Sequence, residues 1–238
     1  MATLDDLLKY KDKVVLKHPK TGKDLKAVWV RILGDEDLKE AFRYARIVSA
    51  EKRKGLRDKS SDVYRDEIES VLNESSREDQ ITLILASKEN EFANNAPIVV
   101  PREDLPKIEE IAVEPDAPTL EEQERLDTTE EEQTKKFQEA IEDYIKTKIN
   151  EVKVSLEEMS DETVRDLAAV EYTNVQALQA FLEELNDQKA FRGTYTDEAC
   201  TERGFTSVAA FKNADSSIKT QLITAYNNLE INGDDLKN

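Results

Sequence analysis

The sequence predicts a mainly α-helical protein with a small N-terminal β-hairpin, an α+β chain in which two small helical domains are joined by a proline-rich, acidic linker. Three observations lead to this prediction. Two β-prone runs surround a Pro-Gly turn near the start, which is typical of a hairpin. Apolar residues recur three and four positions apart over much of the remainder, as on one face of a helix. Five of the six prolines lie between positions 97 and 118, where no regular helix is expected.

The hairpin is expected after a short helix at residues 3–10. Residues 13–18 place Val14 and Leu16 between polar neighbours, and residues 25–33 form the second β-prone run. The turn between them contains proline and glycine, which tight turns favour. Because a hairpin alone is only marginally stable in water, it must pack on helices or extend the sheet of a partner.

Three helices are expected after the hairpin. The first runs from Asp35, its expected N-cap, to a stop at Gly55. The second covers residues 63–72. The third is opened by a capping-box pattern in which Ser75 is followed three residues later by Glu78.

The prolines and a run of acidic residues mark the expected domain boundary. Residues 96–133 are assigned to the linker, between an N-terminal domain at 1–95 and a C-terminal helical domain at 134–238. Within the linker, residues 98–100 are β-prone and are expected to form an extended segment that docks on another surface. Residues 119–132 are strongly acidic.

The C-terminal domain is predicted to contain four helices. An amphipathic helix is expected at 135–154 and another at 160–170. A third is predicted to start at a capping box formed by Thr173 and Gln176, and the last is expected to begin at Asp215. The apolar face of the first of these helices consists of Phe137, Ile141, Tyr144, Ile145, Ile149 and Val152.

The charge balance restricts the classes of partner. The chain has 52 acidic and 34 basic residues, a formal net charge of −18. Such a chain repels nucleic acid and anionic membrane surfaces, so basic or hydrophobic protein partners are expected instead. A more specific interpretation of the same negative charge is that the protein mimics nucleic acid. Neither a secretory signal nor a membrane-spanning stretch is predicted, and the expected setting is the reducing cytoplasm.

No catalytic residue, metal site or cofactor is expected. The single cysteine, Cys200, excludes an internal disulfide and a cysteine-based zinc site, and it is interpreted as a small core residue rather than a nucleophile. The single histidine, His18, lies in the predicted hairpin turn, away from any partner that could orient a general base. The acidic clusters fall in first turns of predicted helices, where negative charge suits the helix dipole.

One positively charged stretch stands out at residues 52–59, with the sequence Lys-Arg-Lys-Gly-Leu-Arg-Asp-Lys. It is compatible with contact to nucleic acid or to an acidic partner. The alternative is a solvated helix end, where cations are stabilised by the dipole.

An apolar set in the C-terminal helices has two possible interpretations. Its residues can line a groove for a partner helix, or they can form the core of the domain. The residues expected to contact a partner are Phe181, Leu185, Phe205, Phe211, Leu222 and Tyr226.

The C-terminal end also carries a family resemblance. Residues 199–205 and 211–215 lead into a closing helix of the form apolar-x3-apolar-x3-Tyr-x2-Leu, which is made by Ile218, Leu222, Tyr226 and Leu229. This ending resembles that of tail assembly chaperones from long-tailed bacteriophages. A hairpin followed by an acid-started helix, and an acidic middle segment, fit the same proteins.

The resemblance implies a function. Such chaperones bind the long, helical, aggregation-prone tape measure protein, help to recruit tail tube subunits, and leave before the tail is finished. An acidic coat around an apolar groove would cover the client's hydrophobic helix faces while keeping the complex soluble. A chaperone of this kind is expected to be monomeric or small, although an oligomer is possible.

Two other classes of function remain open. A structural virion component, such as a head–tail joining or tube-associated protein, would form a closed ring of fixed stoichiometry. An unrecognised enzyme or regulator would have a deep pocket with convergent carboxylates, or a Cys200 with a perturbed pKa.

Overall fold

The computed structural model describes residues 11–96 and 120–234, with side chains described outside 120–133 and 231–234. The protein is mainly helical with a small antiparallel hairpin, which confirms the predicted fold class. The helix expected at 3–10 and the extended segment expected at 98–100 lie outside the described residues.

The described chain forms two compact units that are not consecutive in sequence. Unit 1 is made of Met1–Tyr64 and Thr173–Asn238, and unit 2 is Arg65–Tyr172. This division differs from the one expected at residues 96–133. The hairpin needs a surface to pack on, and it finds this surface on helices near the other end of the chain.

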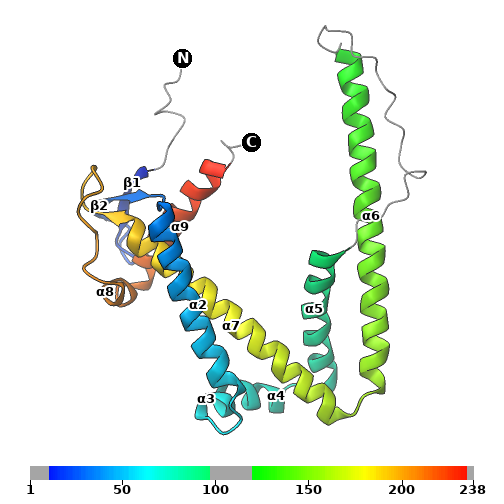
Figure 1. The fold of residues 1–238 in the computed structure, drawn as a ribbon. Helices are drawn as coiled ribbons and strands as arrows, with labels where there is room; N and C mark the ends of the chain where they lie inside the picture. The colour runs from blue at the N-terminus through cyan, green and yellow to red at the C-terminus, as the bar shows by residue number, and fades with distance from the viewer. Residues whose placement is uncertain (1–10, 97–119, 235–238) are drawn as a thin grey trace. The chain divides into compact units, whose positions relative to one another are not determined.

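Unit 1 begins with the hairpin, as predicted. Strands β1 (Lys11–Lys17) and β2 (Asp24–Arg31) pair antiparallel, and β3 (Thr194–Tyr195) adds to the free edge of β2. Gly22 adopts a φ of +65°, which favours glycine, and its N–H donates to the His18 carbonyl at 2.9 Å. The sheet therefore joins segments from both ends of unit 1 (Figure 1).

Helix α2 (Asp35–Arg57) follows the hairpin and packs its small residues inward. Ala41 and Ala45 are fully buried. The N-cap is Gly34 rather than Asp35, which lies in the first turn. The helix also passes through Gly55 and ends two residues later, so the predicted stop was wrong; glycine in a helix weakens it but does not forbid it.

The remaining helices of unit 1 come from the C-terminal part of the chain. They are the later half of α7 (Asp161–Gly193), α8 (Val208–Lys212) and α9 (Ser216–Asp234). Asp215 caps α9 as predicted, accepting from the Ser217 N–H at 2.9 Å. The predicted helix start at Thr173 was wrong: α7 runs straight through it, because the sequence there contains no glycine or proline that would end a helix.

The core of unit 1 lies between the sheet and these helices. Gln221 of α9 holds both backbone groups of Lys17, donating to its carbonyl at 3.0 Å and accepting from its N–H at 2.8 Å. The buried members of this core are Leu16, Val28, Val30, Leu33, Ala41, Ala45, Leu185, Ala190, Phe211, Leu222, Tyr226 and Leu229.

The chain passes from unit 1 into unit 2 along a helix that is interrupted by one π turn. The elements are α3 (Asp62–Tyr64, in unit 1), the π turn η1 (Arg65–Glu69) and α4 (Ser70–Glu74). The π turn interrupts the single helix that the sequence predicts at residues 63–72. The helix α5 (Arg77–Asn95) then starts at a capping box, which is formed by Ser76 and Asp79 and not by the pair one residue earlier.

The helix α6 (Leu120–Glu158) is the longest in the described chain. It begins within the expected linker, so residues 120–133 are helical. Arg77, at the start of α5, donates to the carbonyls of Leu156 at 3.0 Å and Met159 at 2.8 Å and pairs with Asp161. These bonds place the start of α5 beside the end of α6, so the two helices run antiparallel (Figure 1).

Candidate functional site

The predicted partner-contact residues lie mainly in the core of unit 1. Phe211 and Leu222 are fully buried, and Leu185 and Tyr226 are 7% and 1% exposed. Phe181 and Phe205 are partly buried against the same core. The four buried residues cannot reach a partner while unit 1 is folded, so the core interpretation replaces the prediction for them.

The packing of these residues explains the burial. The Phe205 and Phe211 rings meet edge to face, with centroids 5.1 Å apart. The Tyr226 hydroxyl accepts a hydrogen bond from the backbone N–H of Leu33 at 3.1 Å. A sequence pattern cannot show which side of a helix faces the hairpin, because the hairpin lies nearly two hundred residues away.

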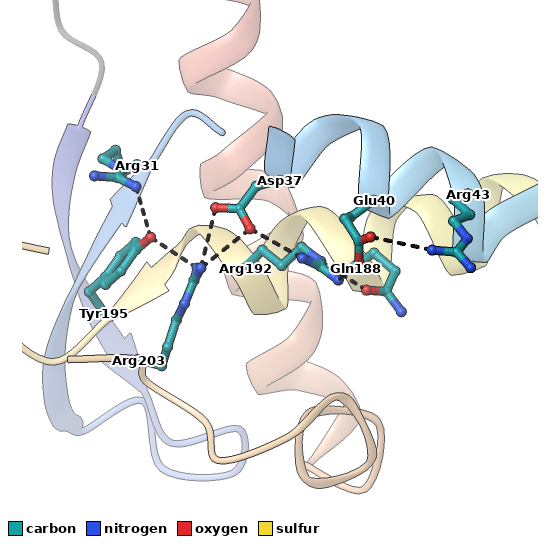
Figure 2. A network of polar contacts seen from close by, with 8 residues as sticks. All are labelled: Arg31, Asp37, Glu40, Arg43, Gln188, Arg192, Tyr195 and Arg203. Carbon is teal, nitrogen blue, oxygen red and sulfur yellow. Dashed lines mark hydrogen bonds and ion pairs between the residues drawn. The ribbon is translucent and has the colours of Figure 1, made fainter. Parts of the chain in front are cut away.

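A network of ion pairs joins the segments of unit 1 (Figure 2), and no local sequence pattern indicates it. Arg192 of α7 pairs with Asp37 at 3.1 Å and with Glu40 at 3.3 Å. Arg203 pairs with Asp37 at 3.3 Å. Asp37, in the first turn of α2 and expected to be solvated, therefore ties α2 to α7 and to the loop after β3.

Tyr195 lies at the other end of this network. Its hydroxyl accepts hydrogen bonds from Arg31 at 3.0 Å and from Arg203 at 2.9 Å. Both guanidinium groups also lie over its ring, 5.0 and 4.9 Å from the centroid. Every charged group at the centre of the network has a partner, so the arrangement suits holding the fold together rather than acting on a substrate.

The groups considered for catalysis are spread apart. His18 lies in the hairpin turn, where its Nδ1 accepts from the N–H groups of Lys20 and Thr21 at 3.2 and 3.3 Å. Cys200 is buried in the loop after β3, as predicted. Within residues 11–96 and 120–234, no group of three or more histidine, cysteine or acidic side chains is placed to hold a metal ion.

A groove with positively charged walls lies on unit 1. It is open, has a volume of about 500 Å³ and is formed by α2 together with one residue of α7. The basic stretch at residues 52–59 supplies three of its cations. The lining residues are Arg46, Ser49, Ala50, Arg53, Lys54, Arg57 and Phe181.

The second open surface is the apolar stripe of α6, in unit 2. This stripe was predicted from the sequence, and the structure leaves all six of its residues only half-buried. Leu156, near the end of the helix, is the one fully buried residue of α6 among those with described side chains.

The lengths of the two helices show how much of α6 lies beyond α5. Among the described elements, α6 packs chiefly against α5. Both helices rise by about 1.5 Å per residue, and α5 has 19 residues while α6 has 39. The shorter helix therefore accompanies only about the C-terminal half of α6 (Figure 1). Phe137 lies near or beyond the end of this reach, and the other five stripe residues stay half-buried along it.

Comparison of the chain with protein-family models, with curated protein sequences and with solved structures finds no match. In the part of the chain that the structure describes, no helix combines the length and the apolar character needed to cross a membrane.

Proposed function

We propose that the protein is a non-enzymatic assembly factor that binds the apolar faces of helical partner proteins. The half-buried stripe of α6 carries this proposal. It offers apolar side chains along more than four helical turns, and a partner helix that packs there would remove them from water, a favourable exchange.

Within this class, the resemblance of the C-terminal segment favours a tail assembly chaperone of a long-tailed bacteriophage. Its clients would be the tape measure protein and the tail tube subunits, and it would act in the cytoplasm of the host cell. The net charge of −18 supports this assignment, because a strongly charged surface keeps a complex with an apolar client in solution.

The test is co-expression with the products of the neighbouring genes, followed by light scattering on a sizing column. The variant replaces Phe137 and Ile141 by glutamine. These two residues lie in the part of the stripe near or beyond the reach of α5, so unit 2 should keep its helices. The matched control is Val154→Gln, which alters a 49% exposed residue on the opposite side of α6.

The wild-type protein and the Val154 variant should each gain the mass of a client, and the double variant should not, with unchanged circular dichroism in all three. Client binding that survives in the double variant would contradict the proposed role of α6. A stable ring of six or more copies without any client would contradict the chaperone assignment and favour a structural virion component.

A further inference from the structure

The groove on α2 is unusual for so acidic a chain, because its walls carry four cations and none of its lining residues is acidic. Arg46, Arg53 and Arg57 follow one another at intervals of seven and four residues, so they lie on one side of the helix. With a rise of 1.5 Å per residue, their backbone positions span about 16 Å.

The charges of these three arginines are not used within the described chain. Each side chain is exposed, and the described residues form no ion pair with any of them. The arginines of the network in Figure 2 behave differently, since Arg192 and Arg203 are held by carboxylates.

The helix dipole accounts for only part of the cluster. It stabilises cations within the last turn of a helix, which includes Lys54 and Arg57. Arg46 lies three turns before the end of α2, beyond the range of that effect. A solvated helix end, the alternative considered for this stretch, therefore does not explain the whole row.

Part of the lining of the groove is apolar. It consists of Ala50 and the ring of Phe181, whose centroid lies 6.1 Å from that of Phe42. Leu178 and Leu182 stand one turn before and one residue after Phe181 on α7, and they are 57% and 49% exposed. Apolar surface thus lies beside a row of unpaired positive charge.

We propose that this groove binds an acidic, amphipathic helix of a protein partner. Carboxylates at intervals of four and seven residues on such a helix would face the three arginines, while its apolar side chains would contact Phe181 and Leu178. The contact goes beyond the proposed function, because it concerns a different surface and a partner of different chemistry from the α6 stripe.

A peptide partner fits the surface better than a nucleic acid does. A nucleic acid would bring a long row of phosphates toward a chain with a net charge of −18, and this repulsion would oppose binding. A short acidic helix carries only a few charges and adds apolar contacts that a phosphate backbone lacks.

The test uses fluorescence anisotropy with the full chain and a labelled, helix-forming peptide of about 15 residues. Its polar face carries glutamates at the matching intervals, and its other face carries leucines. A second peptide has glutamine in place of each glutamate, and the third probe is a single-stranded oligothymidylate.

The protein variant is Arg46→Gln, Arg53→Gln and Arg57→Gln together. Arginine and glutamine have similar helix propensities, so α2 should remain intact. The matched control is Lys20→Gln, Lys23→Gln and Lys26→Gln, which removes three exposed positive charges from the hairpin of the same unit.

We expect the glutamate peptide to bind about tenfold more weakly to the arginine variant than to wild type, because three lost pairs that each contribute the usual fraction of a kcal/mol add up to about that factor. The affinity of the lysine variant for the glutamate peptide should differ from that of wild type by less than about twofold. The glutamine peptide should bind wild type as weakly as the glutamate peptide binds the arginine variant. Added salt should weaken wild-type binding.

If the arginine and lysine variants lost equal affinity for the glutamate peptide, the proposal would be overturned, because binding would then respond only to net charge. Binding of the glutamine peptide as tight as that of the glutamate peptide would also overturn it. Tighter binding of the oligothymidylate than of the glutamate peptide would assign the groove to nucleic acid instead. The α6 variants should bind the acidic peptide normally, so either proposal can fail without the other.

Discussion

Replacing Tyr226 by phenylalanine removes a single oxygen atom and, with it, a buried hydrogen bond. The Tyr226 ring is 1% exposed, and its hydroxyl accepts from the Leu33 N–H at 3.1 Å. Phenylalanine keeps the ring in the core but leaves that backbone N–H without its partner. The bond joins α9 to the segment after β2, so its loss reports directly on contact between the two chain segments of unit 1.

The size of the effect follows from this geometry. Leaving a buried donor unsatisfied costs about 1–3 kcal/mol, whereas Tyr226→Ala would also remove the ring and should cost more, about 3–5 kcal/mol. A domain has roughly 5–15 kcal/mol of stability in total. The phenylalanine variant should therefore remain folded but with a clearly lower midpoint in denaturant.

Urea unfolding followed by tryptophan fluorescence measures this change, because Trp29 lies on β2 within unit 1. The control is Tyr44→Phe, since Tyr44 is 44% exposed. A free energy of unfolding equal in the two variants would refute the hydrogen bond and the pairing of chain ends inferred from it.

The same tyrosine predicts a pH dependence. Burial raises the pKa of the Tyr226 phenol above its ordinary value of 10.0. Above about pH 10, the unfolded chain releases this proton while the folded chain retains it, so stability falls as the pH rises. Wild type should lose its advantage over the phenylalanine variant there, by up to about 1.4 kcal/mol per pH unit. If the difference in free energy of unfolding between wild type and the phenylalanine variant stayed constant from pH 9 to pH 11, this reasoning would be contradicted.

Three further changes test other contacts. Gly193→Ala should destabilise unit 1 by about 1–3 kcal/mol, because the added Cβ would lie 2.8 Å from the Arg31 carbonyl oxygen and from the Tyr226 ring. Gly55→Ala should instead stabilise α2 by about 0.5–1 kcal/mol, because its Cβ would meet nothing closer than 3.7 Å. Thermal melting should therefore show a lower melting temperature for the first variant and a higher one for the second. Ser76→Ala should cost about 1 kcal/mol in urea, more than Ser75→Ala, because Ser76 makes the cap of α5. Burial raises the pKa of Asp187, so Asp187→Asn should raise the melting temperature at pH 7, and the gain should vanish as the pH falls below the ordinary value of 3.8, where both folded and unfolded carboxyl groups are protonated.

Local sequence signals predicted the local structure well. The alternation around Val14 and the Pro-Gly turn predicted the hairpin, and Asp215 was correctly placed at the start of the last helix. Both signals act between residues that are close in sequence. Ser75 and Ser76 were both possible N-caps of α5, and the structure shows that Ser76 is the one used.

Long-range structure could not be derived in this way. The prolines and the acidic run indicated a boundary at residues 96–133, yet unit 1 closes through pairing of Val30 with Thr194, which no local pattern indicates. Core residues and partner-binding residues share the same apolar chemistry, so the sequence allows either role for Leu222. Its complete burial in the fold assigns it to the core.

The groove was only partly visible in the sequence. The basic stretch at 52–59 was apparent, but Arg46 lies outside it and joins the row only through the helical repeat. Phe181 comes from a distant helix. The sequence contained each component, but not the fact that α2 and α7 place them side by side.

Unit 1 can be completed only late in translation, because its two chain segments are synthesised far apart in time. β2 emerges early, but the strand that covers its outer edge is residues 194–195, and α9 follows later still. At about 5–20 residues per second, the gap lasts on the order of 10–30 seconds. All of unit 2 is synthesised within that interval, so the inserted unit can fold first. During translation, the nascent chain carries an unpaired sheet edge of the kind that attracts other strands.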